Sequence, residues 1–221
     1  MALGKSKLSN LNKKKIQRNI KIGISILVSV VTLFPVYAVL INSFKTNGQI
    51  FSAPFAIPAP PNLDAYVGIL TKNADFWMFF FNSTVVAALT IGIILITAFM
   101  ASLALSRLRF PGHAKVYNYF VMGMLFPLTV AILPLYLQLR ALGMIGSLSG
   151  VILAQVSFGL PTSIFILTGF FREIPQEFQD ATQVDGGGIG TFGFKILLPI
   201  STPVISTVTV INFIQSWNQF L

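Results

Sequence analysis

Few side chains in this sequence have the types and the spacing that catalytic chemistry requires. The chain contains no cysteine, which excludes a thiolate metal site, a disulfide framework and a cysteine nucleophile. His113 is its only histidine, so neither a zinc site nor a Ser-His dyad can be assembled. We therefore expect no catalytic residue, no metal and no bound cofactor.

A glycine pattern at 188–193 has the Gly-x-Gly-x-x-Gly spacing of dinucleotide sites. Such a site needs a strand before the glycines and a βαβ unit around them, whereas an apolar helix is expected to follow here. Gly193 is followed by Phe194 and not by the lysine of a phosphate-binding loop. We therefore do not expect this chain to hydrolyse ATP, and we interpret the glycines as allowing a tight turn that fits a partner's cleft.

The acidic residues are unevenly distributed along the chain. Four of the six lie between 172 and 195, and with two basic residues they give this segment a net charge of −2. Pro175 suits the first turn of a helix, carboxylates favour its N-terminal end, and the glycines at 186–188 end it, with Gly186 in the left-handed conformation. The pattern predicts a short helix from Pro175 to Val184 that meets a basic partner, and a solvated connector is the alternative. The acidic residues are Glu173, Glu177, Asp180 and Asp185.

Hydrophobicity defines the elements that must position these residues. Hydrophobic residues make up 54% of the chain and charged residues 10%, whereas soluble domains carry about 25% charged residues. About 20 apolar residues cross a bilayer, so the charge-free stretches predict an all-α, polytopic membrane helix bundle. Four prolines exclude 46–63 as a span. Six others are expected to kink or begin helices: Pro35, Pro127, Pro134, Pro161, Pro199 and Pro203. We expect five spans, at residues 22–41, 80–105, 116–139, 149–171 and 196–214.

The basic residues predict the orientation of this bundle. Twelve of the fifteen lysines and arginines fall in the tail 1–21 and the loops 106–115 and 172–195, and three fall on the alternating loops. By the positive-inside rule, the N-terminus is then cytoplasmic. The same rule explains the net charge of +9 without nucleic-acid binding. A cleaved signal peptide is not expected, because no small-residue cleavage pattern follows the first span.

Polar residues inside the expected spans are few and uncharged. Proton-driven carriers usually need ionisable groups at membrane depth, so this pattern disfavours a secondary carrier. Asn82, Gln155 and Asn212 are candidates for a substrate pathway, with interhelical hydrogen bonding as the alternative for each. Asn82 also begins a glycosylation pattern, which we interpret as helix packing or pathway lining. Ala98, Ser102 and Ser106, each one turn from the next, would let another helix approach closely.

The segment 160–203 closely resembles the signature loop of binding-protein-dependent ABC importer permeases. That loop carries a Glu-Ala-Ala triplet, an Asp-Gly pair and an ending Ile-x-Leu-Pro. In this chain aspartate replaces the glutamate and threonine the second alanine, which keeps the charge and the small size but slightly lowers helix propensity. The matching residues are Asp180, Ala181 and Thr182, then Asp185 and Gly186, then Ile196 to Pro199.

Further segments narrow the resemblance to one branch of that family. Residues 42–45, 103–113, 134–153 and 217–218 are similar to the maltose-permease-like sugar permeases. The resemblance implies a type I importer fold over 22–221, with six spans and both termini cytoplasmic, so the chain is expected to be truncated before the sixth span. It also implies that the loop 172–195 couples the membrane domain to an ATPase.

The function implied by the resemblance is that of a permease subunit, not an enzyme, in an ATP-driven sugar importer of a prokaryotic cell membrane. Its implied partners are a homologous second permease, a cytoplasmic ATPase dimer that binds the ATP, an extracytoplasmic solute-binding protein and membrane lipid. The alternatives are a carrier or channel subunit, a scaffold without transport, and a permease for a solute such as glycerol phosphate. The implied coupling residues are Glu177, Asp180, Ala181, Thr182, Asp185, Gly186 and Pro199.

Overall fold

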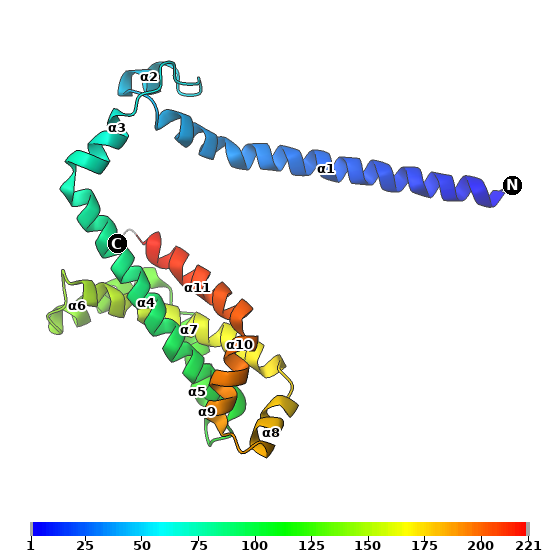
Figure 1. Ribbon diagram of the computed structural model, residues 1–221, viewed down its shortest axis with the longest axis vertical. Coiled ribbons are helices and arrows are strands. Elements are labelled where there is room, and N and C mark those ends of the chain that lie inside the picture. The colour runs from blue at the N-terminus through cyan, green and yellow to red at the C-terminus, as the bar shows by residue number, and fades with distance from the viewer. Residues whose placement is uncertain (1, 220–221) are drawn as a thin grey trace. The chain divides into compact units, whose positions relative to one another are not determined.

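The computed structural model describes the backbone of residues 2–219 and the side chains of residues 14–219 (Figure 1). Every regular element in this range is a helix. The chain divides into two compact units, Met1–Trp77 and Met78–Leu221, each with its own internal contacts. The all-α architecture predicted from the sequence is therefore confirmed.

The first unit contains one long helix and three short helical segments. They are α1 (Ala2–Asn42), α2 (Asn47–Ser52), α3 (Asp64–Val67) and the π-helical turn η1 (Gly68–Lys72). The proline-rich stretch 46–63 forms only α2 and irregular chain, as the loss of backbone donors predicts. Thr46 begins α2 with a capping box, in which its side chain accepts from Gln49 N and the Gln49 side chain accepts from Thr46 N.

Lys45 holds the end of α1 against the proline-rich stretch. Its side chain is buried, and Nζ donates to Asn42 Oδ1 at 2.9 Å, Ala53 O at 2.8 Å and Pro54 O at 3.1 Å. Burying an ammonium group is costly unless its donors are paired, and these three oxygens match its three donors. Lys45 therefore closes this stretch into an ordered loop.

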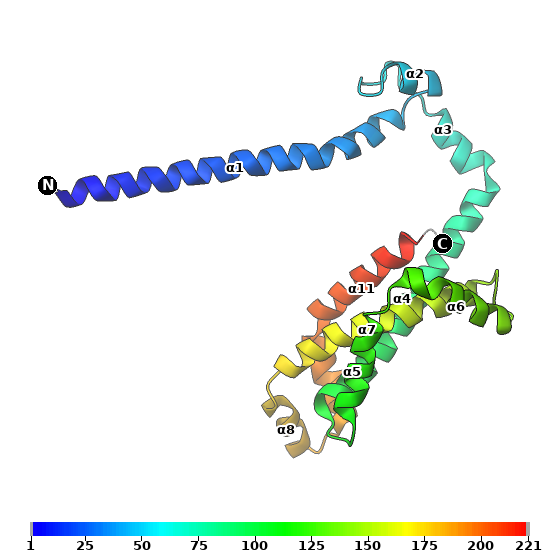
Figure 2. The same ribbon diagram turned by 180° about the vertical axis from the view of Figure 1, so that it is seen from behind.

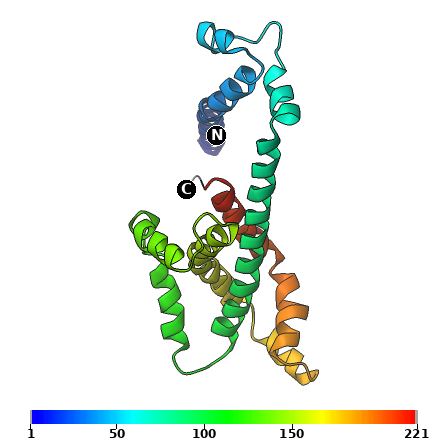
Figure 3. The same ribbon diagram turned by 90° about the vertical axis from the view of Figure 1, so that its left-hand side faces the viewer.

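The second unit is a bundle of helices joined by short connections. All three views place the short helix α8 at one end of this unit, beyond the end of α7 (Figures 1, 2 and 3). The helix α4 begins just before the boundary between the units. The elements are α4 (Ala74–Arg107), α5 (His113–Gly123), α6 (Leu128–Ala141), α7 (Leu148–Glu173), α8 (Glu177–Val184), α9 (Ile189–Thr191), the π-helical segment η2 (Phe192–Leu197), α10 (Leu198–Ile200) and α11 (Thr202–Trp217).

The described residues contain three helices that are long and apolar enough to cross a membrane. These are Lys14–Asn42, Ala74–Arg107 and Leu148–Glu173. Two further helix pairs reach that length only as bent spans, α5 with α6 at 101° and Ile189–Ile200 with α11 at 75°. The described part of the chain therefore has three to five candidate spans.

The single helix expected over 116–139 is two helices in the structure. α5 ends at Gly123, α6 begins at Leu128, and their axes differ by 101° (Figure 3). Pro127 provides the physical reason, because its backbone is extended (φ −67°, ψ 131°) and its ring has no N–H to continue the helical hydrogen bonds. The apolar stretch is continuous in sequence, but the helix is not.

Pro203 accounts for the bend before α11. Its missing N–H leaves the carbonyl of Pro199 without a helical donor, and the Thr202 hydroxyl donates to that oxygen at 2.8 Å instead. Ser201, between the two bent helices, is fully buried. The expectation that prolines kink or begin helices is confirmed at Pro127 and Pro203, whereas Pro35, Pro134 and Pro161 lie inside α1, α6 and α7.

The core of the second unit lies between α4, α7 and α11. Ala98 of α4, Leu167 of α7 and Val208 of α11 are completely buried. Ser102, one turn beyond Ala98, is also buried, and its hydroxyl donates to Ile164 O of α7 at 3.2 Å. Small residues at these positions therefore do allow α7 to approach α4 closely, as predicted.

Candidate functional site

α8 is the short helix predicted from the acidic segment. It runs from Glu177 to Val184, with Gln176 at its N-cap. Glu177 and Asp180 lie in its first turn, where the partial positive charge of a helix N-terminus favours carboxylates. The Gln176 side chain also donates to Asp180 Oδ1 at 3.4 Å. Local sequence therefore predicts this helix, although it begins at Glu177 and not at Pro175 as expected.

Two glycines end α8. Gly186 has φ +78°, a conformation that costs residues with a Cβ about 1–2 kcal/mol. Gly186 N donates to Gln183 O at 3.0 Å and Gly187 N donates to Thr182 O at 2.8 Å, the Schellman arrangement that satisfies the last carbonyls of a helix. A Cβ on Gly187 would lie 2.8 Å from Thr182 Cγ2. The predicted left-handed helix end at Gly186 is confirmed.

α8 has one buried face and one exposed face. Gln179 and Thr182 are 7% and 5% exposed, and the Thr182 hydroxyl donates to Phe178 O within the helix. Thr182, one of the predicted coupling residues, lies on the buried face and packs the helix against its own unit. The predicted contact residues on the exposed side are Glu177, Asp180, Ala181, Asp185 and Gly186.

Arg107, the last residue of α4, joins α8 to the rest of the unit. Its guanidinium donates to Phe171 O and, at 2.7 Å, to Ile174 O at the end of α7, and at 3.3 Å to Gln176 Oε1. The same group lies over the Phe192 ring, 5.4 Å from the ring centroid. The sequence indicated no hydrogen-bonding role for Arg107, because these partners lie 64 to 69 residues away in the chain.

The glycine pattern at 188–193 includes a site of close helix packing. Gly193 lies against α4, where a Cβ would be 2.7 Å from Leu103 Cδ2. The other two glycines of the pattern have open space around them. Within residues 2–219 no strand precedes the pattern, so it lacks the context of a dinucleotide site. The remaining predicted coupling residue, Pro199, is exposed on α10 and not on α8.

Polar side chains from three helices meet at a cavity of about 380 Å³. Gln155 Oε1 of α7 accepts from Thr90 Oγ1 of α4 at 3.2 Å and from Ser216 Oγ of α11 at 2.7 Å. None of the described side chains that line the cavity carries a formal charge. The other lining residues are Leu128, Phe158, Gly159, Asn212, Gln215 and Gln219.

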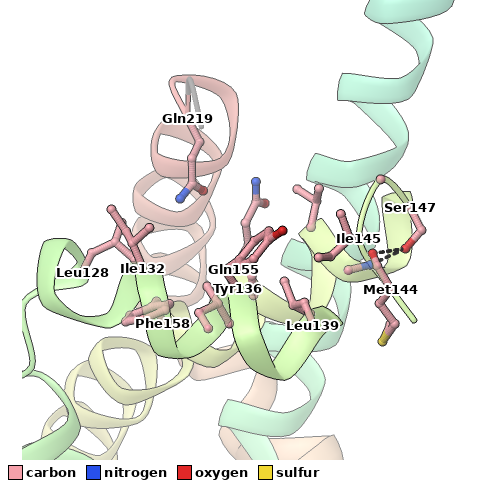
Figure 4. A pocket seen from close by; sticks show the side chains of 15 residues that line it. Leu128, Ile132, Tyr136, Leu139, Met144, Ile145, Ser147, Gln155, Phe158 and Gln219 are labelled. Atoms are coloured by element: carbon pink, nitrogen blue, oxygen red, sulfur yellow. Dashed lines mark hydrogen bonds between the residues drawn. The ribbon is translucent and has the colours of Figure 1, made fainter. Parts of the chain in front are cut away.

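A second cavity of about 280 Å³ shares part of this lining, including Gln155 and Gln219 (Figure 4). Most of its other lining residues are apolar and come from α6, α7 and the loop between them. Tyr136 of α6 adds a phenol ring to the two amides. The two cavities together offer amide, hydroxyl and aromatic groups.

The three predicted pathway residues differ in their surroundings. Gln155 lines both cavities, and Asn212 lines the first. Asn212 is 5% exposed, and its Nδ2 donates to Ser163 Oγ at 3.0 Å and to Val208 O at 2.8 Å, so the interhelical hydrogen bond considered as its alternative is present. Asn82 is half-buried on α4 and lines neither cavity.

The fold and these sites together define a class of protein. Membrane-length helices enclose uncharged cavities, and a short acidic helix is exposed at one end of the unit. This is the architecture of an integral membrane permease.

Comparison with known proteins identifies the family. The chain is 35% identical over 196 residues to the diacetylchitobiose uptake system permease protein NgcG of Streptomyces coelicolor. The alignment covers 89% of this chain and 65% of that relative. It is 31% identical over 189 residues to the trehalose transport system permease protein SugB of Mycobacterium tuberculosis. This alignment covers 86% of this chain and 68% of that relative. No family model matches the sequence.

A solved structure agrees on the fold. A chain from the crystal structure of a bacterial ABC transporter involved in the import of the acidic polysaccharide alginate matches with a TM-score of 0.81 and 21% identity, over 92% of this chain and 71% of that chain. The relatives that are at least 30% identical over more than two thirds of their length, such as SugB, show that the protein belongs to the ABC transporter permease family, as the segment 160–203 indicated. It spans about two thirds of the length of these curated relatives.

Proposed function

We propose that this chain is a permease subunit of an ATP-driven importer and moves a sugar across the membrane. Two relatives support the substrate class, since their names describe the uptake of diacetylchitobiose and the transport of trehalose. The observation that carries the proposal is the exposed acidic helix α8, which offers a charged surface to a partner outside the bundle. ATP is bound and hydrolysed by that partner, a separate cytoplasmic ATPase.

Coupling takes place at the exposed side of α8. Glu177 and Asp180 contact a basic surface of the ATPase, and Asp185 extends the contact beyond the helix end. Gly186 sets the angle at which α8 meets the ATPase, while Thr182 packs the opposite face. ATP binding closes the ATPase dimer, displaces α8 and tilts the membrane helices from an inward-facing to an outward-facing arrangement. α8 transmits force and makes or breaks no covalent bond.

The complete importer contains further partners. A second, homologous permease subunit completes the pathway, two ATPase copies bind below, and an extracytoplasmic solute-binding protein delivers the sugar. Side chains such as Val31 and Val39 of α1 are 65% and 70% exposed, which suits contact with lipid or with a neighbouring subunit. The importer lies in the cell membrane of a prokaryote.

Reversing the charge of α8 tests the coupling proposal. The double variant Glu177→Lys with Asp180→Lys should reduce co-purification of the ATPase several-fold, since two attractive exposed contacts become repulsive. Such contacts are screened over roughly 10 Å at 0.1 M salt, so association of the wild-type protein should also weaken as salt rises.

Glu173→Lys is the matched control for this charge reversal. Glu173 is exposed and has the same charge, but it ends α7 and does not lie on α8. It should leave ATPase association near the wild-type level. Equal association of the ATPase with the wild type and the double variant at low salt would refute the docking role of α8.

The orientation proposal places the N-terminus and the loop 106–115 in the cytoplasm. Ser52 and Ala114 are both exposed, and the chain has no other cysteine to react. In intact cells, an impermeant thiol reagent should label Ser52→Cys from outside and should leave Ala114→Cys unlabelled until the membrane is permeabilised. Labelling of Ala114→Cys alone in intact cells would show the opposite orientation.

The two cavities support a neutral sugar as the substrate of this subunit. Sugar hydroxyls pair with amides and hydroxyls such as those of Gln155 and Ser216, and the apolar faces of sugar rings pack on aromatic side chains such as Tyr136. A phosphate or carboxylate group would find no lysine or arginine among the described lining residues. This favours an uncharged sugar over glycerol phosphate.

Gln155→Met tests the cavity assignment because it removes the amide at nearly constant side-chain size. Losing one or two neutral hydrogen bonds should lower the uptake rate at saturating binding protein by about 2- to 10-fold, with ATPase assembly unchanged. The control is Ser157→Ala, which removes an exposed hydroxyl that is bonded only within α7, to Leu153 O. If both variants take up sugar equally fast, Gln155 is a structural residue only.

A further inference from the structure

Arg107 occupies a position where four elements of the second unit meet. It ends α4, bonds the end of α7 and the start of α8, and lies over a ring of η2. α4 is separated from α8 along the chain by α5, α6 and α7. The contact between α4 and α8 is therefore made by the Arg107 side chain, because the two helices are not adjacent along the chain.

The Phe171 carbonyl at the end of α7 needs a hydrogen-bond donor that its own helix does not provide. In a continuing helix, the residue four positions after Phe171 would donate its N–H to the Phe171 carbonyl, but that residue is Pro175, which has none. Among the described residues, the backbone donor to this oxygen at the helix end is Ile174 N, at a long 3.4 Å. The Arg107 guanidinium donates to the same carbonyl and to that of Ile174. Arg107 therefore caps α7, where a positive charge is also favoured by the helix dipole.

The guanidinium also reaches the exposed face of α8 through one intermediate. Arg107 donates to Gln176 Oε1 at 3.3 Å, and Gln176 Nε2 donates to Asp180 Oδ1 at 3.4 Å. Asp180 is one of the carboxylates that we assign to the ATPase contact. A continuous path of hydrogen bonds thus runs from the end of α4 to the docking surface.

We propose that Arg107 is the positioning residue that transmits displacement of α8 to α4, so that α4 moves together with α7 when the ATPase closes. This inference rests on the coupling function proposed above. Only arginine provides all of the contacts at once, because its planar group donates in several directions while its face lies on Phe192. A lysine ammonium can reach the carbonyls but has no face to stack and cannot bridge to Gln176 with the same geometry.

The test uses the complete importer, reconstituted with its ATPase and its sugar-loaded binding protein. Arg107→Gln should co-purify with the ATPase at normal stoichiometry and keep basal ATP hydrolysis. Stimulation of hydrolysis by loaded binding protein should fall by about fivefold or more, the lower end of typical coupling between sites. Arg107→Lys should give an intermediate loss. The matched control Arg109→Gln changes an exposed arginine just beyond the end of α4 and should keep wild-type stimulation.

A second variant keeps the test decisive if Arg107→Gln fails to assemble. Gln176→Ala changes an exposed side chain and removes only the link from Arg107 to Asp180, so it should lower stimulation without affecting assembly. In the double variant with Arg107→Lys, the loss of stimulation should be smaller than the sum of the losses in the two single variants, because both residues act on one path.

Two kinds of failure are distinguishable in this experiment. If the wild-type importer shows stimulation while Arg107→Lys and Gln176→Ala both keep it, the positioning role of Arg107 is overturned and the coupling function stands. If the wild-type chain neither binds an ATPase nor stimulates it, the proposed function itself fails, and this inference fails with it.

Discussion

Replacing Gly186 with valine should leave the protein in the membrane at near-normal levels and remove coupled transport. Gly186 adopts φ +78° just beyond α8, and a residue with a Cβ pays about 1–2 kcal/mol in that conformation. No atom lies within 4 Å of the added Cβ, so the strain is conformational and local. The chain relieves it by abandoning the left-handed turn, which changes the angle at which α8 would meet the proposed ATPase.

The expected measurements separate folding from coupling. Membrane levels of Gly186→Val should match the wild type, while sugar-stimulated ATP hydrolysis should drop by about fivefold or more. The stimulated ATP hydrolysis of Gly186→Asn should lie between those of the wild type and Gly186→Val, because asparagine tolerates the left-handed region better than valine.

Gly188→Val is the control for Gly186→Val. It lies two residues further in the same loop, has φ −90° and has open space around its Cβ position. The same substitution should therefore be tolerated there. Wild-type transport by Gly186→Val would show that the segment 172–195 is only a connector.

Replacing Gly159 with valine should destabilise the bundle itself. A Cβ at Gly159 of α7 would lie 2.5 Å from Ile94 Cδ1 of α4 and 2.6 Å from Asn212 Oδ1 of α11. Neither neighbour can easily give way, since Ile94 is 1% exposed and Asn212 is held by bonds to Ser163 and Val208. The helices must therefore separate, and overpacking of this kind typically costs about 1–3 kcal/mol.

The measurement is thermal stability of the purified protein in detergent or nanodiscs. Overpacking by 1–3 kcal/mol corresponds to a melting temperature roughly 2 to 12 °C lower for a chain of this size. Gly169→Val is the matched control, because Gly169 lies on the same helix and no atom lies within 4 Å of its Cβ position. A melting temperature of Gly159→Val equal to that of Gly169→Val would mean that α4 and α11 do not cross α7 at Gly159.

The sequence by itself determined the features that depend on neighbours a few residues away. The fold class follows from stretches of apolar residues, and α8 follows from carboxylates near its start and glycine at its end. Family membership was also visible from the segment 160–203, because its motif is contiguous. These features are local, since caps, helix dipoles and hydropathy act within one or two helical turns.

Only the tertiary structure decided which distant residues meet. Thr90 and Ser216 bond Gln155 across 65 and 61 residues of chain, and no spacing in the sequence indicates that these three helices share a cavity. The burial of Thr182 and the hydrogen bonds of Arg107 were likewise not predictable from their residue types. Which side chains meet depends on how bent helices pack, and the angles of 101° and 75° arise where a proline removes a donor and the surrounding structure decides how the chain turns.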